Sequence, residues 1–200
     1  MAGINKGLLP LQPSSKPNHY AMKSYPLILL LGIAITIYSL SCLSANKNQA
    51  TKNTLQWMSW EEALKAQKKK PKKLLIDVYT NWCGWCKRMD ENTFSNPEVQ
   101  AYIAKHFYAV KLNAEQKEEL HFRGEVFKWV PNGRRGYHEL AAALLDGRLS
   151  FPSLVYLDEN LARITISPGY KDVAQLIKEM KYIAEEHYIN TPWEEFESKK

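Results

Sequence analysis

The chain has 200 residues and 45% of them are hydrophobic, which is enough for one domain with an ordinary core and some additional segments. Three lysines and no acidic residues precede Cys42, so the formal net charge of +6 falls to +3 for residues 43–200. A mild basic excess without an arginine-rich stripe or a nucleic-acid motif argues against a nucleic-acid partner. The three cysteines are too few for a disulfide scaffold.

Residues 22–42 have the features of an export signal. A lysine follows Met22, an apolar run of 14 residues covers 27–40, and small residues come next. This run has the length of a signal-peptide hydrophobic region and is short for a membrane span of about 20 residues. Residues 1–21 add nothing that a signal needs, so we expect translation to start at Met22 and the upstream extension to be non-native.

Cys42 stands where a bacterial lipoprotein carries its lipidated cysteine. Ser41 suits such a site, Ser39 departs from the usual leucine, and Ala45 offers another cleavage point. Lipidation of Cys42, simple secretion and an uncleaved anchor therefore stay open. In each case we expect an exported domain that is periplasmic or is held at the membrane and faces the periplasm.

The segment after the signal begins with residues 43–55, which are rich in Asn, Lys, Thr and Ser and predict a flexible linker. Ser59 and Glu62 have the spacing of a capping box, which predicts a short helix that ends before Pro71. The lysines within 68–73 are predicted to form a solvated turn, and contact with anionic lipid is the alternative.

Residues 74–79 (Leu-Leu-Ile-Asp-Val-Tyr) are almost all apolar and predict a strand that is buried on both faces. After a polar turn, Cys83 and Cys86 are three positions apart. If a helix begins at Cys83 and continues to about Glu91, its free amide groups and positive dipole end favour a Cys83 thiolate. Cys86 lies almost one turn further in and can form a disulfide with Cys83. The pair therefore indicates a dithiol–disulfide redox site.

Several elements are predicted between this site and the middle of the chain. Residues 95–98 (Ser-Asn-Pro-Glu) read as a second capping box that starts a helix, and 108–112 alternate as a strand. Residues 114–135 are treated as an insertion with a small hairpin around Gly124. This insertion either shapes one wall of a groove or is a surface decoration. A helix is predicted over 137–145.

The last part of the chain predicts an antiparallel hairpin from 153–157 and 163–166, followed by an amphipathic helix over 172–184. The tail, 188–200, contains Trp193 and Phe196, which can dock on the domain. The order of these elements predicts an α/β fold with a mixed central sheet and helices on both faces.

Five segments resemble the thioredoxin superfamily, in the family's order, over about residues 56–187. Trp82-Cys83-Gly84-Trp85-Cys86-Lys87 is similar to the family's Trp-Cys-Gly-Pro-Cys-Lys, with Trp85 in place of proline. The others are Asp77, Lys111-Leu112-Asn113, Phe151-Pro152-Ser153 and Pro168-Gly169-Tyr170. The similarity is closest to the periplasmic branch with Trp-Cys-Gly-Trp-Cys motifs. It implies a thioredoxin-like three-layer sandwich, with the insertion placed before the cis-proline strand.

The resemblance also implies roles for single residues. Asp77 would take and return the proton of Cys86, and the positive charge of Lys111 would partly offset the negative charge of Asp77. Burying a carboxylate in an apolar strand costs free energy unless it has a function or a partner, and burial raises its pKa. The alternative is that Asp77 faces solvent on the strand.

The substrate-binding residues implied by the resemblance are Trp82, Trp85, Phe151, Pro152 and Gly169. Pro152 would have a cis bond and hold Phe151 against the substrate chain, while Gly169 permits close approach from the other side. The two tryptophans would form an apolar rim, with ordinary aromatic packing as the alternative.

The predicted reaction is thiol–disulfide exchange, which needs an exposed Cys83 and no cofactor. Protein disulfides or dithiols are the expected substrates, and a membrane electron donor is a candidate for re-reducing the pair. The match at Asp77, Lys111 and Lys87 favours a reductase, although Trp85 leaves the direction open. The alternative is a non-catalytic module that holds a soft ion such as Cu(I) or helps folding. Apart from this soft-ion alternative, no metal site is expected, because the histidines lack a compact ligand spacing.

Overall fold

The computed structural model of the chain describes residues 55–198. The predicted extension (1–21), the export signal (22–42), Cys42 and nearly all of the linker lie outside the described residues. No helix within 55–198 is long and apolar enough to cross a membrane.

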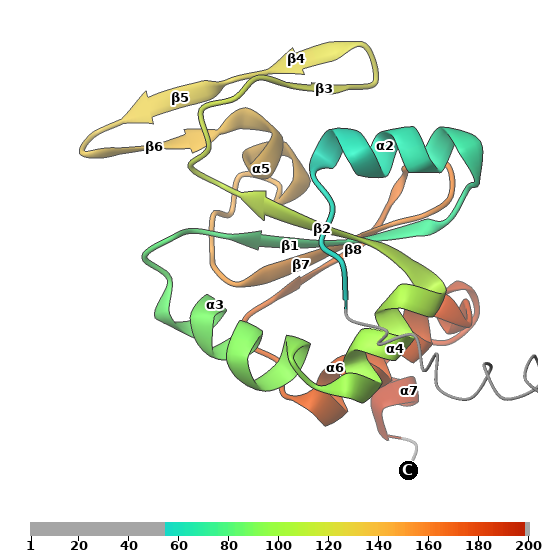
Figure 1. Cartoon of the computed structure of the whole chain (residues 1–200). Coiled ribbons are helices and arrows are strands. Elements are labelled where there is room, and N and C mark those ends of the chain that lie inside the picture. Colours follow the sequence, from blue (N-terminus) through green and yellow to red (C-terminus); the bar gives the residue numbers. More distant parts are fainter. Residues whose placement is uncertain (1–54, 199–200) are drawn as a thin grey trace, which may run out of the picture. The chain divides into compact units, whose positions relative to one another are not determined.

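A four-stranded mixed sheet forms the centre of the described part, with the strand order β2-β1-β7-β8 (Figure 1). The strands are β1 (Lys73–Tyr79), β2 (Phe107–Asn113), β7 (Ser153–Leu157) and β8 (Arg163–Pro168). β1 runs parallel to β2 and antiparallel to β7, which pairs antiparallel with β8. The predicted mixed sheet and its closing hairpin are confirmed.

Helices cover both faces of this sheet (Figure 1). One face carries α2 (Trp60–Lys69) and α5 (Glu139–Leu144), and the other carries α3 (Gly84–Met89), α4 (Pro97–His106) and α6 (Val173–Ala184). Alternate residues of β1 divide between the two cores: Ile76 and Val78 pack with α2 and α5, and Leu75 packs with the other three helices. Asp77 shares the side of Leu75, because side chains alternate along a strand. The three-layer thioredoxin-like sandwich is confirmed.

The lysine run before β1 differs in part from its prediction. Ser59 caps α2 through the predicted capping box with Glu62. Lys73, however, is not in a solvated turn, because it begins β1 and is only 5% exposed. Its Nζ lies 2.9 Å from a carboxylate oxygen of both Glu159 and Glu186. Burial of this ammonium is tolerated because two carboxylates accompany it.

The capping box predicted at 95–98 is wrong, although the helix is present. Asn96 is the N-cap of α4, and its Oδ1 accepts hydrogen bonds from the amides of Glu98 and Val99. The cysteine helix does not end near Glu91, because a π-helical turn, η1 (Asp90–Phe94), continues α3. Ser95 keeps helical backbone angles at the end of that turn and so cannot adopt the extended conformation of an N-cap.

The insertion contains two hairpins rather than one. The predicted hairpin is confirmed as β3 (Leu120–Phe122) and β4 (Glu125–Phe127), with Gly124 in the left-handed region at φ 85°. A second hairpin joins β5 (Trp129–Asn132) to β6 (Arg135–His138).

The second hairpin includes the first residues of the helix that was predicted over 137–145. Pro131 lies within β5 opposite Gly136, because a two-stranded sheet tolerates proline at its edge. Tyr137 belongs to β6, so α5 starts at Glu139 with His138 as its N-cap.

The end of the chain packs on α6, which Asp172 caps together with Gln175. A short 3-10 turn, η2 (His187–Ile189), leads to α7 (Trp193–Ser198). The rings of Trp193 and Phe196 lie 5.1 Å and 5.0 Å from the ring of Tyr182 on α6. Docking of the aromatic tail is therefore confirmed.

Candidate active site

Cys83 and Cys86 form a disulfide at the start of α3. Cys83 is the N-cap of this helix, as predicted, and its Sγ accepts a hydrogen bond from the backbone amide of Cys86 at 3.1 Å. A donor aimed at this sulfur also favours negative charge on it, because a hydrogen bond to the charged form stabilises that form. The local fold therefore suits Cys83 as the nucleophile of a reduced pair.

The expected exposure of Cys83 is wrong for the disulfide form. Cys83 and Cys86 are only 5% and 3% exposed when they are joined in the disulfide. The neighbouring indoles are open instead: Trp82 is 52% exposed and Trp85 is 55% exposed. A partner that approaches the disulfide must therefore come between or against these two rings.

Asp77 and Lys111 form a buried ion pair on the face of the sheet that α3 covers. They are directly paired in the β1–β2 register, and Lys111 Nζ lies 2.6 Å from Asp77 Oδ2. Asp77 is 1% exposed, so the predicted burial is confirmed. Burial raises the pKa of the Asp77 carboxyl, the charge of Lys111 opposes this rise, and Asp90 adds to it. The second oxygen, Oδ1, is buried without a hydrogen-bond partner in the described part of the chain.

Asp90 is a further member of this cluster that sequence reasoning missed. Its Oδ1 accepts a hydrogen bond from Lys111 Nζ, which also lies 4.9 Å from the ring centre of Trp57 and 5.0 Å from that of Tyr79. Burial alone would lower the pKa of Lys111, but its two carboxylate partners raise it. The available signal was the spacing, since Asp90 follows Cys86 by four residues, which places both on one side of a helix.

The predicted substrate-binding residues lie around the cysteine helix. The Phe151–Pro152 peptide bond is cis, as predicted, and the amide of Gly169 donates a hydrogen bond to the Pro152 carbonyl at 2.8 Å. Gly169 has a φ of 87°, a left-handed conformation that favours glycine. Trp82 meets Phe151 edge to face at 6.1 Å between ring centres. The predicted segments before β7 and after β8 therefore meet near α3.

The insertion also reaches this site. Arg135 of β6 lies over the ring of Trp82, with 4.3 Å from its guanidinium carbon to the ring centre. Trp82 Nε1 donates a hydrogen bond to Glu115 Oε1 at 3.0 Å. Sequence reasoning identified neither Arg135 nor Glu115, because both contacts join segments that are distant in the chain. These contacts favour the interpretation of the insertion as one wall of a groove.

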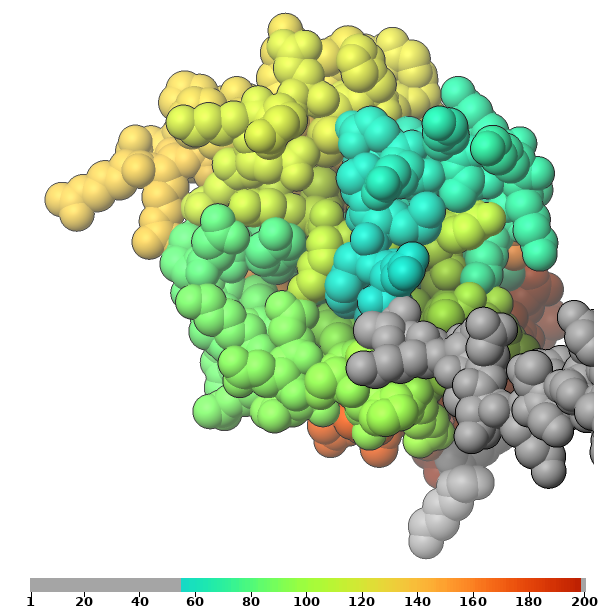
Figure 2. Space-filling view, in the orientation of Figure 1, coloured from blue at the N-terminus to red at the C-terminus, as the bar shows by residue number. Residues whose placement is uncertain are grey.

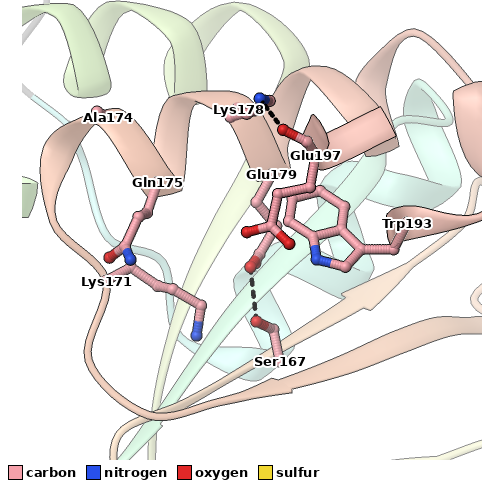
Figure 3. Close-up of a pocket in the computed structure, with 8 residues that line it drawn as sticks. All are labelled: Ser167, Lys171, Ala174, Gln175, Lys178, Glu179, Trp193 and Glu197. Atoms are coloured by element: carbon pink, nitrogen blue, oxygen red, sulfur yellow. Dashed lines mark hydrogen bonds between the residues drawn. The ribbon is translucent and has the colours of Figure 1, made fainter. Parts of the chain in front are cut away.

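A separate pocket of about 310 Å³ lies between β8, α6 and α7 (Figure 3). Within it, Ser167 Oγ donates a hydrogen bond to the buried Glu179 carboxylate at 2.6 Å, and Trp193 forms one wall. No predicted site residue lines this pocket. The residues from 55 to 198 also contain no group of three or more His, Cys, Asp or Glu side chains placed to hold a metal ion. The cysteine site is thus the candidate active site.

Comparisons with known proteins agree with this fold. The family model described as "Thioredox_DsbH: Protein of unknown function, DUF255" matches residues 40–195. A thioredoxin-fold protein from Helicobacter pylori superposes with a TM-score of 0.51 at 20% identity, covering 74% of this chain and 88% of that protein. At this identity the structural likeness concerns the fold alone.

Two relatives differ in how much of their length they share. The Disulfide bond reductase DsbH of Chlamydia pneumoniae is 25% identical over 151 residues, which cover 68% of this chain and 84% of that protein. Human Spermatogenesis-associated protein 20 is 29% identical over 69 residues, which cover 34% of this chain. That match spans only 9% of the human protein.

Proposed function

The chain belongs to the Thioredox_DsbH (DUF255) family. We therefore propose that it is a thiol–disulfide oxidoreductase acting on protein substrates. The observation that carries the proposal is the Cys83–Cys86 disulfide at the start of α3. The buried Asp77–Lys111 pair on the sheet face beneath that helix supports it. The direction we propose is reduction, supported by the name of the chlamydial relative, a disulfide bond reductase.

The proposed reaction begins with the reduced pair. The Cys83 thiolate attacks one sulfur of a substrate disulfide, so a mixed disulfide forms and the other substrate sulfur leaves as a thiolate that takes a proton. Cys86 then loses its proton and attacks Cys83, which breaks the mixed disulfide and releases the second substrate thiol. Two electrons pass from the dithiol to the substrate, and the chain keeps the Cys83–Cys86 disulfide.

Asp77 is the proposed acceptor of the Cys86 proton. A buried carboxyl with a raised pKa, one of whose oxygens has no hydrogen-bond partner among residues 55–198, can take a proton and return it. Lys111 holds the other oxygen and thereby limits the cost of ionising the group. The proposed substrate contacts are Trp82, Trp85, Phe151, Pro152 and Gly169, which together offer aromatic surface and backbone groups.

The place of action that we propose is outside the cytoplasm. The support is the export signal predicted at 22–42, with lipidation of Cys42 or an uncleaved signal as routes to membrane attachment. An oxidised pair must be reduced again before the next turnover, and a membrane electron donor is the proposed source of those electrons.

Trapping of partners tests the proposed function. In a Cys86→Ala variant the mixed disulfide on Cys83 cannot be resolved, so we expect covalent complexes that reducing agent releases and mass spectrometry identifies. The matched control is the Cys83→Ala, Cys86→Ala double variant, which should capture nothing. If the single variant also captures no protein, the oxidoreductase proposal fails and a dithiol that only binds a soft metal ion becomes the better account.

A further inference from the structure

Each of the two exposed indoles beside Cys83 has an arginine over its ring. The guanidinium carbon of Arg135 lies 4.3 Å from the centre of the Trp82 ring, and that of Arg88 lies 4.8 Å from the centre of the Trp85 ring. Both distances are in the range of cation–π contacts. We call these four residues the tryptophan–arginine collar.

The two arginines come from unrelated parts of the fold. Arg88 follows Trp85 by three residues within α3, so its contact is set by the helix. Arg135 belongs to the β5–β6 hairpin, which extends from the same side of the molecule as the first residues of α3 (Figure 2). The side chain of Trp129 fills the space beside Gly136, where an added Cβ would lie 2.1 Å from the indole, and this packing supports the strand that carries Arg135.

Neither guanidinium of the collar forms an ion pair with any residue between 55 and 198. Glu115 accepts a hydrogen bond from the indole of Trp82, and Asp90 pairs with Lys111, so neither acid is an ion-pair partner of Arg88 or Arg135. A cation–π contact leaves the N–H donors of a guanidinium available for other acceptors. The collar thus has positive charge and directed donors on both sides of Cys83.

We propose that the collar selects protein substrates whose disulfide cysteine is flanked by aspartate or glutamate. This inference rests on the proposed oxidoreductase function and names its substrate class. Arginine forks bind carboxylates through paired hydrogen bonds, and the indole faces pack against the chain between them. An apolar segment would desolvate two guanidiniums without a partner, and a basic segment would meet like charge.

Two synthetic peptides test this inference. They contain the same disulfide loop and differ only in the flanking residues, which are aspartates in one peptide and asparagines in the other. The rate with the protein is divided by the rate with dithiothreitol alone, so that differences in the peptides' own reactivity cancel. We expect the acidic peptide to be preferred by about three- to tenfold at low salt, because exposed charge pairs are individually modest. The preference should fall as salt rises from about 0.05 M to about 0.5 M.

Variants connect the preference to the collar. Arg88→Gln and Arg135→Gln should each lower the acidic-to-neutral ratio, and the double variant should bring it to about one. Arg123→Gln is the matched control, because Arg123 also lies over an aromatic ring, that of Phe122, but in the β3–β4 hairpin. That variant should keep the ratio of the original chain.

The outcomes separate this inference from the proposed function. A ratio near one in the original chain, or a preference that the double variant retains, overturns the selection of acidic substrates while reduction itself stands. If neither peptide is reduced faster than by dithiothreitol alone, both the selection and the oxidoreductase proposal are wrong.

Discussion

Cys83→Ser is expected to lower insulin reduction by the chain to the rate of dithiothreitol alone. The thiolate of the N-cap cysteine is the atom that attacks the substrate, and a serine hydroxyl cannot form the mixed disulfide. Cys86→Ser should also lose turnover through the pair, because Cys86 is the thiol proposed to resolve the intermediate. The assay follows the turbidity of reduced insulin with dithiothreitol as the electron source.

The third cysteine provides the matched control for that experiment. Cys42 lies outside the described residues, and Cys42→Ser in the whole chain should reduce insulin at the original rate. Circular dichroism of all variants under reducing conditions should show that the fold is kept. Full activity in Cys83→Ser, or no activity in the original chain, would contradict the assignment of the reaction to this pair.

Lys111→Met is expected to cause the largest loss of stability at alkaline pH. The substitution leaves the Asp77 carboxylate buried without its partner, and breaking a buried ion pair costs about 3–5 kcal/mol. We expect about 3 kcal/mol at about pH 9, the lower end, because Lys111 itself is 19% exposed. At about pH 5 the loss should be smaller, because the raised pKa of Asp77 lets the carboxyl become protonated and neutral. Denaturant unfolding at the two pH values measures the difference.

The same pair predicts how stability changes with pH in the original chain. The folded pKa of Asp77 is raised above its ordinary value of 3.8, so the folded state binds more protons than the unfolded state between these two values. Stability therefore falls as pH rises from about 4 through the folded pKa of Asp77. Lys111 adds a second window at alkaline pH: its raised pKa stabilises the folded chain below the ordinary value of 10.5, and this contribution is lost as pH rises through the folded pKa.

Two controls isolate the unpaired charge as the cause. Lys65→Met changes an exposed lysine of α2 and should leave the stability within experimental error at both pH values. Adding Asp77→Asn to Lys111→Met should recover most of the loss at alkaline pH, because no buried charge is then left without a partner. A loss that is equal at both pH values and persists in the double variant would show that Lys111 acts through packing alone.

Much of the site follows from local chemistry that a sequence displays directly. Asp77 stands out as a carboxylate in an apolar strand, and the cysteine spacing places Cys83 at a helix start, where the structure has it. The helix α2 begins at the capping residue that the sequence indicates, because a cap depends on neighbours within four positions.

The parts that were missed depend on contacts between distant segments. The spacing from Cys86 places Asp90 on the same side of the helix, but its contact with Lys111 depends on the distant strand β2. The β5–β6 hairpin contains Pro131, and a proline usually argues against a strand. The pairing of Pro131 with Gly136 on β6 is visible only in the folded structure. Arg135 meets Trp82 through that hairpin, so the collar could not be inferred before the fold was known.

The most direct test of the account is the reactivity of Cys83 in the reduced chain as a function of pH. Alkylation by iodoacetamide, with mass spectrometry to distinguish the two cysteines, reports which sulfur is a thiolate at each pH. We expect Cys83 to react before Cys86, with a midpoint below about pH 8.5, the ordinary pKa of a free thiol. A midpoint at or above that value, or a faster reaction at Cys86, would contradict the claim that the helix start makes Cys83 the attacking thiolate.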